Sequence, residues 1–189
     1  MKVVFSTFFL YTNFVMKKFI SLYKWWQWLI IVIAIAINIF IIINSFMNAN
    51  QSTKESSFVV DMLTSVINGI KPGTINDENI SSFSGVIRKL IGHFGLFLVS
   101  GVFTTLSVKF IYYDLKKKYW IFVIISSSFG LFLAILTEFI QLFVPGRSGE
   151  FRDVMIDFGG YAMPLIIISL IVFFKSKKSS NIEKENELV

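Results

Sequence analysis

The sequence of 189 residues contains no cysteine and only one histidine. Without cysteine the chain can form neither disulfides nor thiolate-based catalytic or metal sites. A single histidine without a recognisable ligand spacing gives little support for a metal site, so we expect no metal, and nothing in the sequence implies a cofactor. The sequence also lacks a nucleotide-binding loop and the inverted repeat that is typical of many transporters.

Hydrophobic residues dominate the composition. They make up 54% of the chain, and the mean hydropathy is +0.69, which is more apolar than soluble domains usually are. A helix needs about 20 mostly apolar residues to cross a bilayer. Four runs have this character: 25–43, 90–112, 119–144 and 154–174. The sequence therefore predicts an all-α, polytopic membrane protein with four transmembrane helices.

The chain divides into an N-terminal segment (1–24), a four-helix membrane domain (25–174) and a polar tail (175–189) that we expect to be disordered. Residues 1–18 have the charged and hydrophobic parts of a signal peptide, but no cleavage site follows them. Two interpretations are open. The segment is an interfacial helix on the inner leaflet, or it precedes a natural start at Met16, which we favour.

Basic residues are distributed unevenly around the four runs. Short loops rich in Lys and Arg stay in the cytoplasm, and an inside N-terminus assigns most of the 18 basic residues to that side. These are Lys2, Lys17, Lys18, Lys24, Lys109, Lys116, Lys117, Lys118, Lys175, Lys177, Lys178 and Lys184. We therefore predict a cytoplasmic-membrane protein with both termini in the cytoplasm. The net charge of +6 does not indicate nucleic acid, because no basic face on a soluble fold is visible.

The segment between the first two runs, residues 44–89, is too long for a simple turn. It contains apolar residues at helical spacing, which predict a helix capped by Ser56 and Ser57 and ended by Gly69 and the "KPG" stretch. The apolar positions are Val59, Met62, Leu63, Val66, Ile67 and Ile70. The outer segment is therefore predicted to be partly helical. Its helix would lie along the outer interface or cover the mouth of the bundle. Alternatively, the segment is a packed connector without a functional role.

Several ionisable residues lie inside the apolar runs. Such residues cost about 2.5–3.5 kcal/mol near the bilayer centre, so they usually face the bundle interior and find partners. His93, Glu138 and Asp157 each lie near the outward end of a run and can share one layer. Residues three or four apart share a helix face, which adds neighbours to this layer. Gln141 shares a face with Glu138, and Lys89 shares one with His93, with Arg88 on the neighbouring stripe. In the fourth run Asp153, Gly160 or Tyr161, and Pro164 can align with Asp157.

The turn between the third and fourth runs contains Pro145, Gly146 and Arg147. Proline and glycine favour leaving the helix, and the arginine can point back toward Glu138. If Arg147 pairs with Glu138 or Asp157, the ion pair is a latch that holds the turn against the helices. Unpaired, it is an anion site for a lipid phosphate or a peptide carboxylate.

Each of these residues also has a structural interpretation. Glu138, Arg147, Asp153 and Asp157 fit equally well as an ion network that holds helices together. His93 is more often an interhelical hydrogen bonder than a catalyst. Two carboxylates can form an acid/base pair, but the sequence shows no nucleophile. A metal held by His93, Glu138 and Asp157 has still weaker support.

Two stretches, "IRKLIGHFGLF" and "TEFIQLFVPGRSGEFRDVMIDFGG", resemble the signature of the VanZ-like family. The resemblance covers about residues 44–164, and Asp157 stands where the family usually has Asn, which adds an acid. The matching positions are Arg88, Lys89, His93, Phe94, Glu138, Gln141, Pro145, Gly146, Arg147, Asp153 and Gly160.

This resemblance implies a bacterial cytoplasmic-membrane protein, in a family whose founding member is associated with low-level teicoplanin resistance. It implies no settled activity. Our leading hypothesis is a non-enzymatic envelope protein whose outward-facing pocket binds an amphiphile, either a lipid-linked cell-wall intermediate or the acyl tail of a lipoglycopeptide. The alternatives are an enzyme acting on a lipid-linked precursor, with Glu138 or Asp157 as acid/base and Arg147 holding phosphate, and a small transporter or assembly partner.

Overall fold

The computed structural model describes residues 23–114 and 118–186, without the side chains of 49–56 and 179–186. The predictions for the N-terminal 18 residues, including a start at Met16, lie outside the described residues. Within the described chain every regular element is helical. The elements are α2 (Trp25–Ser45), α3 (Ala49–Ile70), α4 (Ile80–Ile87), the π-helical η1 (Arg88–Gly95), α5 (Leu96–Val108), the π-helical η2 (Lys109–Asp114), α6 (Tyr119–Gln141) and α7 (Phe151–Asn186).

Four of the described helical stretches are long and apolar enough to cross a membrane: Trp25–Ser45, Ile80–Asp114, Tyr119–Gln141 and Phe151–Lys178. This confirms the predicted all-α, polytopic membrane fold with four transmembrane helices. The second stretch begins ten residues before the predicted start at residue 90, because apolar residues at helical spacing continue back to Ile80 without an intervening proline.

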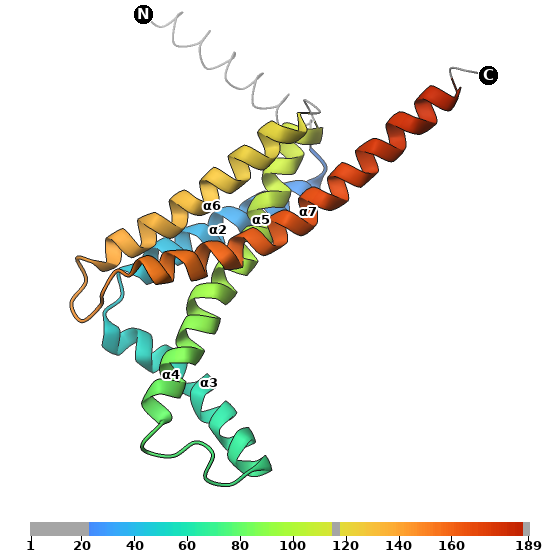
Figure 1. The fold of residues 1–189 in the computed structure, drawn as a ribbon. Helices are drawn as coiled ribbons and strands as arrows, with labels where there is room; N and C mark the ends of the chain where they lie inside the picture. The colour runs from blue at the N-terminus through green and yellow to red at the C-terminus, as the bar shows by residue number, and fades with distance from the viewer. Residues whose placement is uncertain (1–22, 115–117, 187–189) are drawn as a thin grey trace, which may run out of the picture.

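Helices α2, α5, α6 and α7 pack into one bundle, from which α4 and α3 extend away (Figure 1). The most extensive interface is between α5 and α7, followed by those of α6 with α7 and of α2 with α5. Close approach of α5 and α7 requires Gly101, since a Cβ there would lie 2.7 Å from Pro164 Cγ. The core residues are Ile41, Phe97, Leu133, Ala134, Val154, Tyr161 and Leu165.

The predicted helix in the outer segment is present as α3, which packs against α4 and η1. It ends at Ile70, just before the "KPG" stretch as predicted, whereas Gly69 lies within the helix and does not end it; Gly73 follows with a positive φ of 78°. Its start differs, because the helix begins at Ala49 and not near Ser56: no proline or glycine separates the two positions. One face of α3 exposes Phe58 and Met62.

The C-terminal residues up to Asn186 are helical, whereas the sequence predicts a disordered tail from residue 175. Helix α7 was expected to end near residue 174, but it continues to Asn186. After Pro164 this stretch contains neither proline nor glycine, and lysine and glutamate are good helix formers, so nothing local terminates the helix.

Candidate functional site

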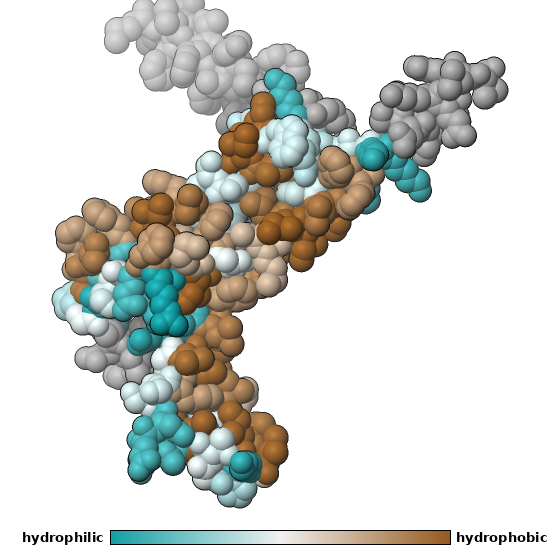
Figure 2. Space-filling model, in the orientation of Figure 1, coloured by the Kyte–Doolittle hydropathy of each residue, from teal (hydrophilic) through white to brown (hydrophobic). Residues whose placement is uncertain are grey.

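A polar layer lies at the end of the bundle where the turn 142–150 joins α6 to α7. Figure 2 shows a hydrophilic patch near the start of α7 on an otherwise largely hydrophobic face. The layer draws its side chains from η1, α6, α7 and the turn. Its members are Arg88, Lys89, His93, Glu138, Gln141, Arg147, Asp153 and Asp157.

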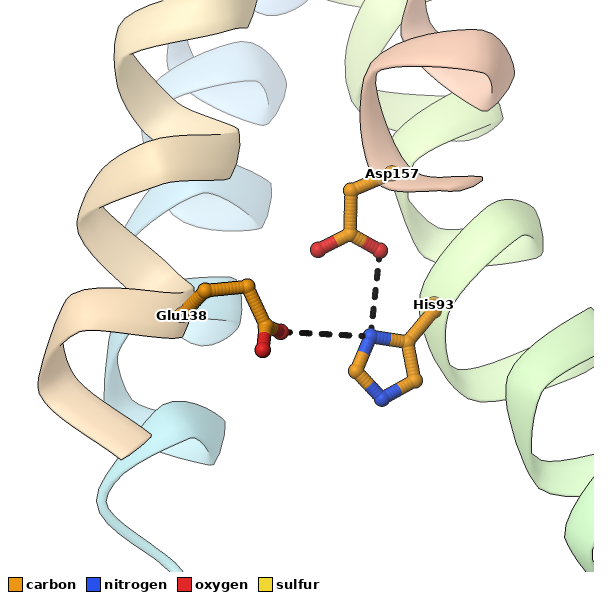
Figure 3. Close-up of side chains that lie close together, drawn as sticks. All are labelled: His93, Glu138 and Asp157. Carbon is orange, nitrogen blue, oxygen red and sulfur yellow. Dashed lines mark hydrogen bonds and ion pairs between the residues drawn. The ribbon is translucent and has the colours of Figure 1, made fainter. Parts of the chain in front are cut away.

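His93, Glu138 and Asp157 meet at the centre of the polar layer (Figure 3). His93 Nδ1 lies 3.1 Å from Asp157 Oδ1 and 3.7 Å from Glu138 Oε1. The three side chains are almost completely removed from solvent, with 9%, 3% and 0% of the residue exposed for His93, Glu138 and Asp157. One imidazole nitrogen therefore joins three helices: η1, α6 and α7.

The Glu138 carboxylate is held in place by two further donors. Gln141 Nε2 donates to Oε1 at 2.9 Å, and the backbone N–H of Glu150 donates to Oε2 at 3.1 Å. The second bond folds the turn back over the end of α6. Gly149 permits this approach, because a Cβ at that position would collide with the carbonyl oxygen of Glu138.

A second polar pair lies one turn earlier on η1 and α7. Lys89 Nζ binds Asp153 Oδ1 and lies 3.5 Å from Glu150 Oε2. The pairs Lys89–Asp153 and His93–Asp157 are both separated by 64 residues, so the two helices run parallel in constant register.

Gly160 lies one further turn along α7. A Cβ on Gly160 would collide with the carbonyl oxygen of Phe94, whereas a Cβ on Gly159 would meet nothing within 4 Å. Gly160 therefore allows α7 to approach the backbone of η1 closely. The π-helical form of η1 was not anticipated from the sequence, and such segments are frequent at functional sites.

Arg147 does not form the latch considered from the sequence. Its Nη1 lies 3.4 Å from the carbonyl oxygen of Asn44 and 3.3 Å from that of Met47, at the C-terminal end of α2. Among the described residues it has no carboxylate ion-pair partner. A cation at this end of a helix is favourable because the last carbonyl groups carry partial negative charge. Pro145 and Gly146, which has a φ of 76°, make the exposed turn before it.

Burial lowers the pKa of the Arg147 guanidinium, and the nearby charge of Arg88 lowers it further, against the opposite effect of the carboxylates. Arg88 is partly buried, and among the described residues no hydrogen bond or ion pair engages its guanidinium. Arg88 and Arg147 line the same cleft. Two cations of like charge thus share this cleft, which Asp157 also lines, and neither forms an ion pair with a carboxylate among the described residues.

The cleft also has an apolar wall. Besides the two arginines, His93 and Gln141, it is lined by the residues of α2, η1, α5, α6 and α7 that follow: Ile41, Asn44, Ser45, Gly92, Leu96, Phe97, Thr137 and Asp157. The contribution of α2 was missed by the sequence analysis. Asn44 and Ser45, two polar residues that end an apolar run, were the available signal.

One ligand atom from each of His93, Glu138 and Asp157 lies within 4.8 Å of the others, so these three residues have the spacing of a metal-ligand group. From the sequence alone no metal is expected, and this group has only weak support as a metal site. The structure brings together the three donors from positions that no short motif connects.

The family model described as VanZ/LLP1 matches residues 28–175. This range contains the whole polar layer and most of each of the four long apolar helices. Comparison with curated proteins and with solved structures gave no significant match. Because the family model covers most of the sequence, the chain belongs to the VanZ/LLP1 family.

Proposed function

We propose that the protein is a bacterial cell-envelope protein whose cleft binds an anionic amphiphile. The observation that carries this proposal is the presence of Arg88 and Arg147 in one cleft with an apolar wall. Guanidinium groups bind phosphate or carboxylate through planar, paired hydrogen bonds. The wall formed by Ile41, Leu96 and Phe97 suits an acyl or prenyl chain.

The orientation that this function requires is supported by the charge pattern. Lys109, Lys118 and the lysines at 175–178 lie at or near the ends of the apolar stretches opposite to the polar layer. Lysine-rich ends face the cytoplasm, so both termini would be inside and the cleft would open outward. The site would then be in the outer half of the cytoplasmic membrane.

Two amphiphiles of the envelope have suitable chemistry. One is a lipid-linked cell-wall intermediate, which carries phosphate on a long apolar chain, and the other is a lipoglycopeptide, which carries an acyl tail. Binding of either at the cleft would alter the membrane anchoring or target access of the drug. The family resemblance supports low-level resistance to teicoplanin as the outcome. The lipid bilayer is the other partner, and no nucleic acid is involved.

The functional test is drug susceptibility in cells that lack the native copy and produce the wild type or Arg147→Ala at equal membrane abundance. We expect the variant to lose protection against teicoplanin while vancomycin susceptibility stays the same, because only teicoplanin is acylated. Arg152→Ala is the matched control, since Arg152 is exposed and lies outside the cleft. Unchanged protection by Arg147→Ala, or equal shifts for both drugs, contradicts the proposal.

An enzyme acting on a lipid-linked precursor is the second candidate. The contact of His93 with both Asp157 and Glu138 favours it, since such a group can exchange a proton with a substrate held by the arginines. Its test is turnover: purified protein would change the mass of an undecaprenyl-linked phosphate, and Glu138→Gln would abolish the change. A substrate mass that stays constant across such lipids counts against it.

A further inference from the structure

We propose that His93, Glu138 and Asp157 bind a divalent transition-metal ion. His93 and Asp157 line the same cleft as the arginines, but metal binding by this group does not depend on the proposed function. Each residue comes from a different helix, and one ligand atom of each lies within 4.8 Å of the others. In Figure 3 the imidazole Nδ1 faces the space between the two carboxylates.

The spacing of the donor atoms suits a metal. Bonds of about 2.1 Å place neighbouring ligand atoms about 3.0 Å apart in octahedral geometry and about 3.4 Å apart in tetrahedral geometry. The observed separations from His93 Nδ1 are 3.1 Å to Asp157 Oδ1 and 3.7 Å to Glu138 Oε1. Both separations from the imidazole nitrogen are thus within a few tenths of an ångström of those in a metal site.

An independent observation concerns the second oxygen of Asp157. Asp157 is 0% exposed, and its Oδ2 is buried without a hydrogen-bond partner among the described residues. The hydroxyl of Thr137 lies near the Asp157 carboxyl and is also within 2.9 Å of the carbonyl oxygen of Ala134, so its one proton is shared between two acceptors. A buried carboxylate oxygen without a donor is costly, and a cation in this group would satisfy it.

The local charge leads to the same conclusion. Two carboxylates, Glu138 and Asp157, are buried here, and even a protonated His93 supplies only one positive charge. The nearby Lys89 is engaged by Asp153 and Glu150, and Arg147 is engaged by backbone carbonyl groups of α2. A divalent ion would neutralise both carboxylates at once.

The surroundings of the three ligands resemble those of metal sites. Gln141 and the backbone N–H of Glu150 orient the Glu138 carboxylate, as hydrogen-bonded outer residues do for metal ligands. One imidazole with carboxylate oxygens suits a first-row transition ion such as Zn²⁺, whereas Ca²⁺ and Mg²⁺ prefer oxygen alone. His93 lines the cleft, so a position not taken by protein ligands would face it.

The test is metal binding by the purified full-length protein in detergent, with any polyhistidine tag removed. After chelation and dialysis against Zn²⁺, elemental analysis should find about one Zn²⁺ per chain. Asp157→Asn keeps the shape of the side chain and removes its charge, so it should weaken Zn²⁺ binding at least about 10-fold in a calorimetric titration. Asp114→Asn is the control and should bind as the wild type does, because Asp114 lies outside the polar layer and pairs with Lys109 instead.

Two results overturn the proposal: wild-type protein without stoichiometric Zn²⁺, and equal Zn²⁺ binding by the Asp114→Asn and Asp157→Asn variants. Gel filtration establishes that each variant is folded, and His93→Gln replaces Asp157→Asn if that variant aggregates. Zn²⁺ should also raise the melting temperature of the wild type but not of the Asp157 variant. Because Zn²⁺ alone is the probe, failure of amphiphile binding leaves this result unaffected.

Discussion

His93 Nδ1 lies 3.1 Å from Asp157 Oδ1, across the interface between η1 and α7. One turn earlier on the same two helices, Lys89 binds Asp153, so two polar contacts in succession fix the parallel register of η1 on α7. Glu138 approaches His93 from α6 and connects the third helix. The polar layer therefore determines how three helices meet at this end of the bundle.

We expect Lys89→Met to destabilise the protein by about 1–3 kcal/mol, because it leaves Asp153 buried without its ion-pair partner. The side chain of Asp153 is only 9% exposed, so water cannot easily replace the lysine. Denaturation in mixed micelles measures the change. Lys71→Met, at an exposed position without an ion pair among the described residues, should stay within about 0.5 kcal/mol of the wild type. Equal stability of the two variants would show that the register does not depend on Lys89.

Neighbouring glycines on α7 should respond oppositely to alanine. In Gly160→Ala the new Cβ meets the carbonyl oxygen of Phe94, which forces η1 and α7 apart at a cost of about 1–3 kcal/mol. In Gly159→Ala the Cβ enters open space, and the better helix propensity stabilises by about 0.5–1 kcal/mol. Thermal unfolding of both variants under one condition measures the difference. Destabilisation by both to the same extent would argue against the close η1–α7 contact.

The absence of cysteine allows the orientation to be tested without background labelling. Ser148→Cys in the exposed turn should react with a membrane-impermeant maleimide in intact cells. Ser176→Cys, which lies among the lysines near the end of the last apolar stretch, should react only after permeabilisation. This pattern follows from the positive-inside rule. The reverse pattern would place the cleft on the cytoplasmic side and remove the basis for an encounter with external drugs.

The sequence was sufficient to predict the four spans, because a bilayer requires long apolar runs that are visible in composition alone. The sequence also predicts that His93, Glu138 and Asp157 lie in one layer. Each is an ionisable residue close to the end of an apolar run, and such residues usually face the bundle interior and find partners there. The partner of Arg147 could not be predicted, because it is a pair of backbone carbonyls at the end of α2 and has no side-chain pattern.

The other differences between the sequence-based predictions and the structure concern the local conformation of the backbone. The π-helical form of η1 has nearly the same side-chain pattern as an α-helix over its eight residues, so periodicity does not distinguish them. The early start of α3 and the long C-terminal part of α7 both occur where polarity suggested irregular structure. In neither place does a proline or glycine interrupt the backbone, and polarity alone does not end a helix.

The central claim is that Arg88 and Arg147 together bind the anionic group of an amphiphile. Its most direct test is equilibrium binding of undecaprenyl phosphate to the full-length protein in nanodiscs of zwitterionic lipid, measured by native mass spectrometry. Wild-type protein should retain the lipid, and Arg88→Gln with Arg147→Gln should weaken binding about 10-fold or more, whereas Arg152→Gln should not. Equal retention by the double variant and the Arg152 control would contradict the account.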